Sequence, residues 1–323
     1  MRRRGCSFVA ALLLVGAAAL GWFGASWWFF SNLDEERAFV VPSGSSLTAV
    51  AQKLENEGVI DSADAFLLRA KILGSSDPIK AGEFMLPAGA SAATILDTFQ
   101  HGEVIRRFVT VPEGLPSIMV WERLMAEPLL TGEVAVPAEG SVLPESYDFE
   151  RGETRAAVLA RMQQAMTRTI DELWPKRAPN AVVKTKQEAL TLASIVEKET
   201  AKPSERPMIA GVLSNRLRTG MMLGADATTI YPITKGKPLG RLIRRSELRD
   251  RNPYNTRAVA GLPPGPITNP GRDSLAAVLN PARTDALYYV ADGTGGHVFS
   301  RTLAEHNANA AKWRALRRAR GEM

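Results

Sequence analysis

The feature that most constrains this chain of 323 residues is a long uncharged segment close to its N-terminus. From Cys6 to Phe30 the sequence contains no Asp, Glu, Lys or Arg, and most of the residues are apolar. About 20 apolar residues in a helix are enough to cross the hydrocarbon core of a bilayer. We therefore predict one transmembrane helix over residues 8–30, which leaves the remainder of the chain to fold in water.

The residues that flank this segment predict its orientation. Arg2, Arg3 and Arg4 precede it, and the positive-inside rule then places residues 1–7 in the cytoplasm. We expect a single-pass protein of the cell inner (cytoplasmic) membrane, whose folded part lies outside the cytoplasm. A cleaved signal peptide is the alternative, since residues 24–26 are small, but the bulky aromatic residues that follow them favour an uncleaved anchor.

Composition argues against several kinds of site. Cys6 is the only cysteine and falls in the apolar segment, so we expect no disulfide and no thiolate metal site in the folded part. The three histidines are scattered, which argues against zinc, and we predict no metal and no cofactor. The net charge of +6 includes a basic stretch at residues 312–320. Because the anchor places this stretch outside the cytoplasm, we interpret it as a solvated basic helix and predict no nucleic-acid partner.

Residues 31–37 predict a short linker, and residues 38–103 predict a small subdomain that begins strand, helix, helix, strand. Strands are expected over residues 38–42 and 82–86. The residues expected to cap its helices are Ser45 or Ser46, Asp61 or Ser62, and Ser91. This βααβ order, with the segment Lys80–Phe84, resembles the LysM fold, a small carbohydrate-binding module. A structural unit without a ligand is the open alternative.

A larger α+β domain is predicted over residues 104–323. It is expected to contain a strand at 105–111 and helices at 116–124 and 154–174. A further helix is expected to open at Thr185, where Thr185 and Glu188 have the form of a capping box. This helix carries two carboxylates near its end and is stopped by Pro203.

The two carboxylates, Glu197 and Glu199, are predicted to point in different directions. Two residues correspond to about 200° around a helix axis. Glu199 shares a face with Leu192, Ile195 and Val196, the apolar stripe expected to face the protein interior, whereas Glu197 lies on a smaller and more polar face. We therefore expect Glu199 to be the more desolvated of the two.

A desolvated carboxyl group is a candidate general acid. Burial disfavours the charged form and raises the pKa, and the negative end of the helix dipole acts in the same direction. An acid that stays protonated near neutral pH can protonate a glycosidic oxygen. The alternative is that Glu197, Lys198 and Glu199 form a solvated helix end.

Several polar segments on expected Pro- and Gly-rich loops predict a sugar-binding surface. Hydroxyls of a sugar need hydrogen bonds, and pyranose faces pack against aromatic rings. The candidate substrate contacts are Glu197, Ser194, Asn215, Asp226, Thr228, Tyr254, Asn255 and Thr256. Taken one at a time, these segments are better explained by turns that bind no ligand.

Taken together, the segments resemble one known family. They are Ala193–Thr200 (ASIVEKET), Asn215–Leu217, Asn252–Thr256 (NPYNT), Ala260–Ile267 (AGLPPGPI), Asn269–Gly271, Tyr288–Gly293 (YYVADG) and Gly296–Phe299. In order and spacing they resemble the endolytic murein transglycosylase family (MltG, YceG-like), over essentially the whole chain. The resemblance implies that Glu199 is the catalytic residue. One departure concerns Gly224–Thr228, which reads GADAT where the family usually has QSDPT, so a subsite contact or the stiffness of this loop is in doubt.

The resemblance also implies an activity. Enzymes of this family cut the β-1,4 bond between N-acetylmuramic acid and N-acetylglucosamine within nascent peptidoglycan strands, and leave 1,6-anhydro ends. Glu199 is then expected to act first as acid and afterwards as base, with peptidoglycan strands and peptidoglycan synthases as partners. Two alternatives remain open: a hydrolytic muramidase, in which Asp226 or Glu197 supplies a second carboxylate, and a non-catalytic glycan-binding scaffold.

Overall fold

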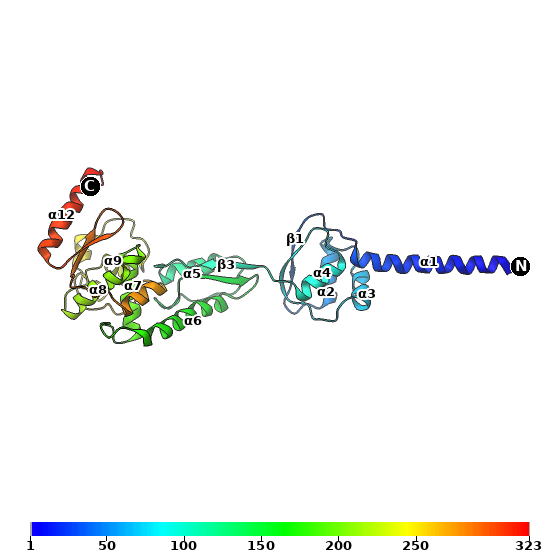
Figure 1. The fold of residues 1–323 in the computed structure, drawn as a ribbon, viewed down its shortest axis with the longest axis horizontal. Helices are drawn as coiled ribbons and strands as arrows, with labels where there is room; N and C mark the ends of the chain where they lie inside the picture. Colours follow the sequence, from blue (N-terminus) through cyan, green and yellow to red (C-terminus); the bar gives the residue numbers. More distant parts are fainter. Residues whose placement is uncertain (1, 323) are drawn as a thin grey trace. The chain divides into compact units, whose positions relative to one another are not determined.

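The computed structural model describes residues 2–322, with side chains from Ala11 onward, and contains both helices and strands as expected (Figure 1). The chain divides into two compact units, residues 1–107 and 108–323, close to the boundary expected between 103 and 104. Each unit has its own hydrophobic core. Within the described residues, the strands form three separate two-stranded sheets.

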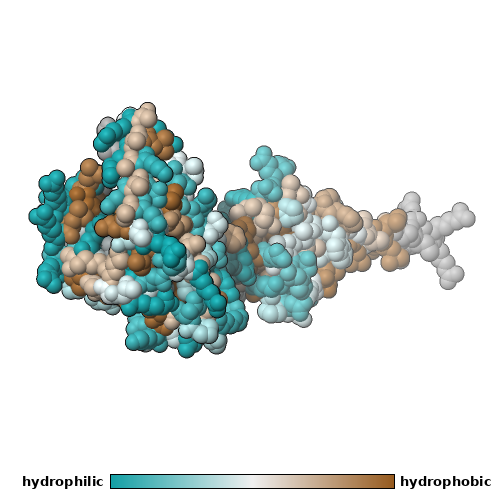
Figure 2. All heavy atoms as spheres, turned by 60° about the vertical axis from the view of Figure 1, so that its left-hand side comes forward, coloured by the Kyte–Doolittle hydropathy of each residue, from teal (hydrophilic) through white to brown (hydrophobic). Residues whose placement is uncertain are grey.

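Helix α1 (Arg2–Trp28) is the element that the uncharged segment predicted. Within the described residues, it is the one helix long and apolar enough to span a membrane, over Ala11–Trp28. Most side chains of that window are exposed, and Figure 2 shows them as a hydrophobic surface along the coloured part of the helix. The expected cytoplasmic segment, 1–7, includes Met1, which lies outside the described residues.

Unit 1 has the predicted order of elements after α1. Its elements are β1 (Arg37–Val41), α2 (Leu47–Asn56), α3 (Ala63–Leu73), β2 (Gly82–Leu86) and α4 (Ala92–His101). The three helices after α1 are capped by Ser46, Ser62 and Ser91, whose side chains accept a backbone N–H of the first turn. The two strands pair antiparallel, with Phe39 opposite Phe84.

The end of α1 belongs to the core of unit 1. Trp27 is 2% exposed and its ring lies 5.7 Å from that of Phe66 on α3. Phe39, Phe84 and Phe99 fill the centre of the same core. The apolar helix therefore continues into the folded unit without a break.

Unit 2 is built mainly from helices, and β3 crosses the boundary between the units. The elements are β3 (Arg106–Thr110), α5 (Ser117–Ala126), β4 (Ser146–Glu150), α6 (Arg155–Leu173), η1 (Trp174–Lys176), α7 (Lys186–Glu199), η2 (Pro203–Glu205), α8 (Arg206–Arg218), α9 (Asp226–Thr234), α10 (Arg245–Arg249), α11 (Arg272–Leu279), β5 (Tyr288–Ala291), β6 (His297–Ser300) and α12 (Leu303–Ala319). Helix α7 packs against α8, α9 and α11.

The apolar face of α7 is fully enclosed. Leu192, Ile195 and Val196 are each 0% exposed, and they pack in one core with residues of α8 and α11. Such burial stabilises the fold by roughly 1.5 to 3 kcal/mol for each large side chain. It also fixes the position of the C-terminal end of α7, where Glu197 and Glu199 lie.

Three local predictions for unit 2 need correction, the first of them only in part, because Thr185 is the N-cap as expected. The Thr185 side chain accepts the N–H of Glu188, but the Glu188 carboxylate reaches back to the N–H of Lys184, 2.5 Å away, so half of the capping box is displaced by one residue. The segment Ser204–Arg206 is expected from the sequence to cap the next helix, but α8 has no side-chain cap, because a 3₁₀ turn over Pro203–Glu205 leads directly into it.

The third correction concerns the segment after Gly224, which was expected to be a loop. Residues from Asp226 onward form helix α9. Asp226 in its first turn complements the positive end of the helix dipole, and the Thr228 hydroxyl bonds back to the Ala225 carbonyl at 2.6 Å. These local contacts favour the helix over the loop that the Thr-rich sequence indicated.

Candidate active site

Glu199 is the last residue of α7. The chain turns away immediately after it, since Thr200 adopts an extended conformation with φ −146° and ψ 132°. The carboxyl group therefore projects from the end of a helix whose other side chains hold it rigidly in the core. Its hydrogen-bond partner is Tyr289 of β5, which donates its O–H to Oε2 of Glu199 at 2.6 Å.

Tyr289 stays neutral in this position. Burial raises its pKa well above the usual range, and the adjacent Glu199 charge acts in the same direction. The phenol therefore keeps its proton and acts as a donor to Glu199. Strands β5 and β6 form the antiparallel hairpin that carries this side chain, with Tyr289 opposite Phe299.

Burial raises the pKa of Glu199, and it is the largest of the causes acting on this group. The nearby Asp226 charge raises the pKa further. The hydrogen bond from Tyr289 lowers it, as do the positions of His297 and Arg216, but the net direction is upward. Glu199 therefore holds its proton to a higher pH than an exposed glutamate does.

The basic residues near Glu199 are held by other partners. Arg216 lies against the ring of Tyr289, with its guanidinium carbon 5.6 Å from the centroid, and donates to the carbonyls of Leu287 and Leu223. His297 bonds to the Glu205 carboxylate at 2.8 Å and meets the Tyr289 ring edge-on. Neither forms an ion pair with Glu199. The acid thus faces a neutral donor rather than a compensating cation.

Glu197 has the opposite environment. Its side chain is only 4% exposed, so burial alone does not distinguish it from Glu199, contrary to the expectation that the polar face of the helix is the more solvated. The difference is charge compensation. Arg206 pairs with Glu197 at 3.0 Å, and the Gly271 N–H donates to it at 2.9 Å. Glu113 and Asp273 complete the group of carboxylates around Arg206.

Most of the other predicted contact residues use their polar groups inside the protein. Ser194 is 0% exposed, donates to the Thr191 carbonyl and accepts the Ile267 N–H, which ties α7 to the Pro-rich segment before Ile267. Thr228 and Thr256 bond to each other at 2.8 Å.

Asn255 and Asn215 also bond to protein groups. The Asn255 amide donates to three backbone carbonyls after α10 begins, and its oxygen accepts the hydroxyl of Thr229. The Asn215 amide donates to the carbonyls of Thr284 and Ala286, which holds the chain leading to β5. Asn255 and Asn215 thus fix the segments that surround Glu199.

Asp226 and Tyr254 are the predicted residues that remain accessible. The Asp226 side chain is 59% exposed and pairs with Arg257 at 2.5 Å. Tyr254 is half-buried, and its ring lies 4.9 Å from that of Tyr231. Asp226 begins α9, which packs against α7, whereas Tyr254 lies in the segment after α10 and packs against the core.

A cavity of about 390 Å³ adjoins the end of α7 and the start of α9. Lys198 and Ala227, the sequence neighbours of Glu199 and Asp226, both line it. Its other walls are mostly apolar and include Leu115, Met119 and Ile230. Within the described residues, Lys198 Nζ contacts only the Gly114 carbonyl, at 3.3 Å, so this cation stands at the cavity without a carboxylate partner.

Comparison with known proteins now decides the family. The sequence model of the YceG-like family matches residues 39–312. The chain belongs to the YceG-like family. The family assignment made from the motifs of residues 193–299 is thereby confirmed.

Two YceG-like relatives and one solved structure are similar over most of the chain. The "endolytic murein transglycosylase" of Bacillus subtilis is 30% identical over 84% of this chain and 83% of its own length. The protein of the same name from Streptococcus pneumoniae is 29% identical over 95% of this chain, which spans 64% of that relative. A crystal structure of a YceG-like protein from Listeria monocytogenes matches 85% of this chain and 98% of its own, with TM-score 0.54 and 28% identity.

Sequence reasoning missed the residues that set the environment of Glu199: Tyr289, which bonds to it, and Arg216 and His297, whose charges act on its pKa. Tyr289, Arg216 and His297 all lie in segments that the resemblance had included, but no role was given to them. The signal for Tyr289 was present in the short YYVA strand, where alternation places only one of two adjacent tyrosines on the side of Glu199.

Replacing Arg206 by Met is expected to destabilise unit 2 by about 3 to 5 kcal/mol, because it leaves the buried Glu197 without its counter-charge. Denaturant unfolding of the full chain in detergent measures this. Arg301→Met is the matched control, since the Arg301–Asp285 pair is exposed and is expected to contribute at most about 1 kcal/mol. Equal losses of stability in both variants would contradict the assignment of Arg206 as the counter-charge of the buried Glu197.

Proposed function

We propose that this chain is a membrane-anchored endolytic transglycosylase that cuts the β-1,4 bond between N-acetylmuramic acid and N-acetylglucosamine in nascent peptidoglycan. The observation that carries the proposal is the environment of Glu199, a buried carboxyl group with a raised pKa and a neutral phenol as its partner. The names of the relatives support the same substrate.

Glu199 acts first as a general acid. Because Tyr289 occupies Oε2, the proton of the acid form is carried on Oε1, which is free to face the substrate. The proton passes to the glycosidic oxygen, the bond from that oxygen to C1 of the muramic acid breaks, and the glucosamine part leaves as an alcohol. Positive charge then develops at C1 and the ring oxygen.

The Glu199 carboxylate acts next as a general base. It takes the proton from the C6 hydroxyl of the same muramic acid while O6 bonds to C1, which closes the 1,6-anhydro ring. No water is consumed, and Glu199 regains the proton that it gave up. One group can serve in both steps, because the carboxylate that Glu199 becomes by giving up its proton is the base that the second step needs.

The neighbours of Glu199 support this double role. The hydrogen bond from Tyr289 stabilises the carboxylate formed after the first step, and the Asp226 charge favours the proton in the resting state. We propose Asp226 and Tyr254 as the accessible groups that contact the sugar near C1. The mainly apolar cavity beside Lys198 suits the apolar faces of adjoining sugar residues.

A hydrolytic muramidase needs a second carboxylate facing Glu199. Glu197 is neutralised by Arg206, and Asp226 is paired with Arg257, so neither is a free base beside the acid. A non-catalytic scaffold does not require an acid with a raised pKa. These observations favour non-hydrolytic cleavage over both alternatives.

The remaining assignments follow from the anchor. We propose that residues 1–7 lie in the cytoplasm and that both units lie outside it, close to the synthases that extend the wall. The β1–α2–α3–β2 arrangement of unit 1 supports a LysM-like role in holding glycan strands.

Glu199→Gln is expected to abolish cleavage, because an amide cannot donate the proton that the leaving oxygen needs. The measurement is digestion of intact sacculi by the full chain in detergent, with mass analysis of the glycan ends. We expect 1,6-anhydro ends from the unaltered protein and none from the variant. Reducing ends would establish the muramidase, and digestion by the variant at the original rate would refute catalysis by Glu199.

Tyr289→Phe is expected to lower kcat by about 10- to 100-fold, which corresponds to the roughly 1.5 to 3 kcal/mol of a hydrogen bond to a charged group. The lost bond had lowered the pKa of Glu199, so the alkaline limb of the pH–rate profile should move to higher pH. Tyr288→Phe, on the next residue, is the control. Comparable losses of kcat in both variants, without movement of the alkaline limb, would contradict the role of Tyr289.

Asp226→Asn is expected to move the alkaline limb of the pH–rate profile to lower pH. The Asp226 charge raises the pKa of Glu199, so its removal lets Glu199 lose its proton earlier as the pH rises. Asp285→Asn, which removes an exposed carboxylate paired with Arg301, is the control and should leave the limb unmoved. A shift of the Asp226→Asn limb to higher pH would refute the electrostatic coupling.

A further inference from the structure

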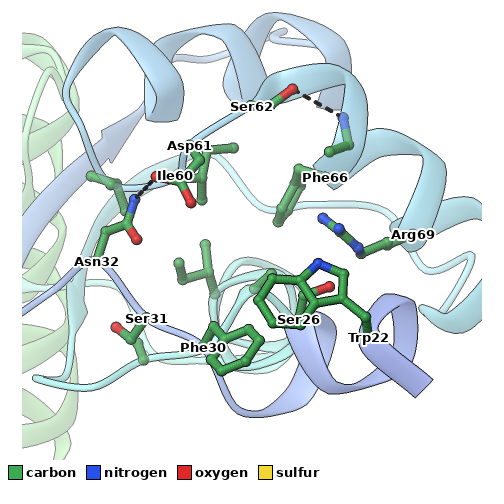
Figure 3. Close-up of a pocket in the computed structure, with 15 residues that line it drawn as sticks. Trp22, Ser26, Phe30, Ser31, Asn32, Ile60, Asp61, Ser62, Phe66 and Arg69 are labelled. Atoms are coloured by element: carbon green, nitrogen blue, oxygen red, sulfur yellow. Dashed lines mark hydrogen bonds between the residues drawn. The ribbon is translucent and has the colours of Figure 1, made fainter. Parts of the chain in front are cut away.

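Unit 1 contains a pocket at the place where α1 meets α3 and the segment before β1. Its volume is about 200 Å³, and its lining includes Trp22, Phe30, Asp61, Phe66 and Arg69. Figure 3 shows the Arg69 guanidinium pointing into this pocket between the rings of Phe66 and Trp22. The pocket holds roughly six or seven water volumes, since one water occupies about 30 Å³ in the liquid.

Arg69 is a cation without a counter-charge. Its Nε is buried and makes no hydrogen bond, and its guanidinium contacts the Phe23 ring, 5.3 Å from carbon to centroid. Within the described residues, no carboxylate lies within ion-pair distance of it. A partly buried guanidinium with unused donors is costly unless an anion accepts from it. The end of the pocket that contains Arg69 is therefore suited to a negatively charged ligand.

Asp61 does not supply the missing charge. Figure 3 places it on the far side of Phe66 from Arg69, and its Oδ1 accepts the amide of Asn32 at 2.7 Å. The pocket thus has a cationic end at Arg69 and a separate acidic rim.

The position of the pocket along α1 identifies the source of the anion. Trp22 lies within the membrane-spanning window Ala11–Trp28, six residues before its end, which corresponds to about 9 Å along a helix. The polar zone of each leaflet is roughly 5 to 8 Å thick outside the hydrocarbon core. Ser31 and Asn32, which also line the pocket, follow the end of the window. The pocket therefore straddles the end of the window, where the hydrocarbon core gives way to the lipid headgroups.

We propose that this pocket binds the phosphate group of one phospholipid of the leaflet on the side of unit 1. Arg69 donates to the phosphate oxygens, which match the fork of a guanidinium. The exposed rings of Trp22 and Phe30, 64% and 48% accessible, lie where the start of an acyl chain contacts them. The site holds unit 1 at a fixed depth in the membrane, and it is independent of Glu199 and of the proposed cleavage.

The test is native mass spectrometry of the full chain, stripped of lipid in detergent and titrated with phosphatidylglycerol. We expect one retained lipid, and an approximately tenfold or larger rise in the concentration for half-occupancy in Arg69→Gln. Lys71→Gln removes an exposed charge from the same helix and should bind like the unaltered protein. Diacylglycerol with the same chains, which lacks the phosphate, should not be retained.

Three results would overturn the proposal. The first is equal lipid retention by Arg69→Gln and the unaltered chain, and the second is a loss of lipid retention in Lys71→Gln as large as that in Arg69→Gln. The third is complete displacement of the lipid by inorganic phosphate, which would indicate a site for the free anion. Circular dichroism establishes that the variants are folded. Should Arg69→Gln fail to fold, Trp22→Ala provides the test, because its exposed ring does not support the core, and retention unchanged in that variant refutes the site.

Discussion

The enclosure of α7 is the constraint on which the candidate site depends. Because its apolar face packs in the core with α8 and α11, the end of the helix is fixed in place, and the carboxyl groups of Glu197 and Glu199 are turned inward while Lys198 between them is exposed. A buried carboxylate must find a cation or hold its proton. The protein uses both solutions two residues apart: Glu197 is compensated by Arg206, whereas Glu199 meets only the neutral phenol of Tyr289. The uncompensated residue is the one to which we assign the chemistry in our proposal.

Features that depend on neighbouring residues were predictable from the sequence. Ser62 and Ser91 cap the helices they were expected to cap, and β2 has the expected bounds, Gly82–Leu86. The length and apolar composition that would let α1 span a membrane can be read from the sequence alone. In each case a short pattern determines the outcome, since a cap or a strand end is decided by the few residues around it.

Long-range pairing was not predictable in the same way. Tyr289 lies 90 residues from Glu199, and only the folded hairpin β5–β6 brings its hydroxyl to the carboxylate. The same limit applies to Thr228, Asn255 and Thr256, for which the sequence suggested sugar contacts. A polar side chain on a Pro- and Gly-rich segment can form hydrogen bonds with a sugar or with the backbone equally well. Here Asn255 bonds to backbone carbonyls, and Thr228 and Thr256 bond to each other and to the backbone.

Hydrogen bonds to Thr256 also hold the start of Gly224–Thr228, the segment that departs from the pattern the sequence resembles. Gly224 donates its N–H to the Thr256 carbonyl, and Ala225, 1% exposed, donates to the Thr256 hydroxyl. Gly224 and Ala225 are therefore held in place through their backbone N–H groups. What changes is the surface, because Ala227 lines the cavity at the end of α7. We therefore expect the departure to change the shape of this cavity, while the bonds to Thr256 hold the residues before it.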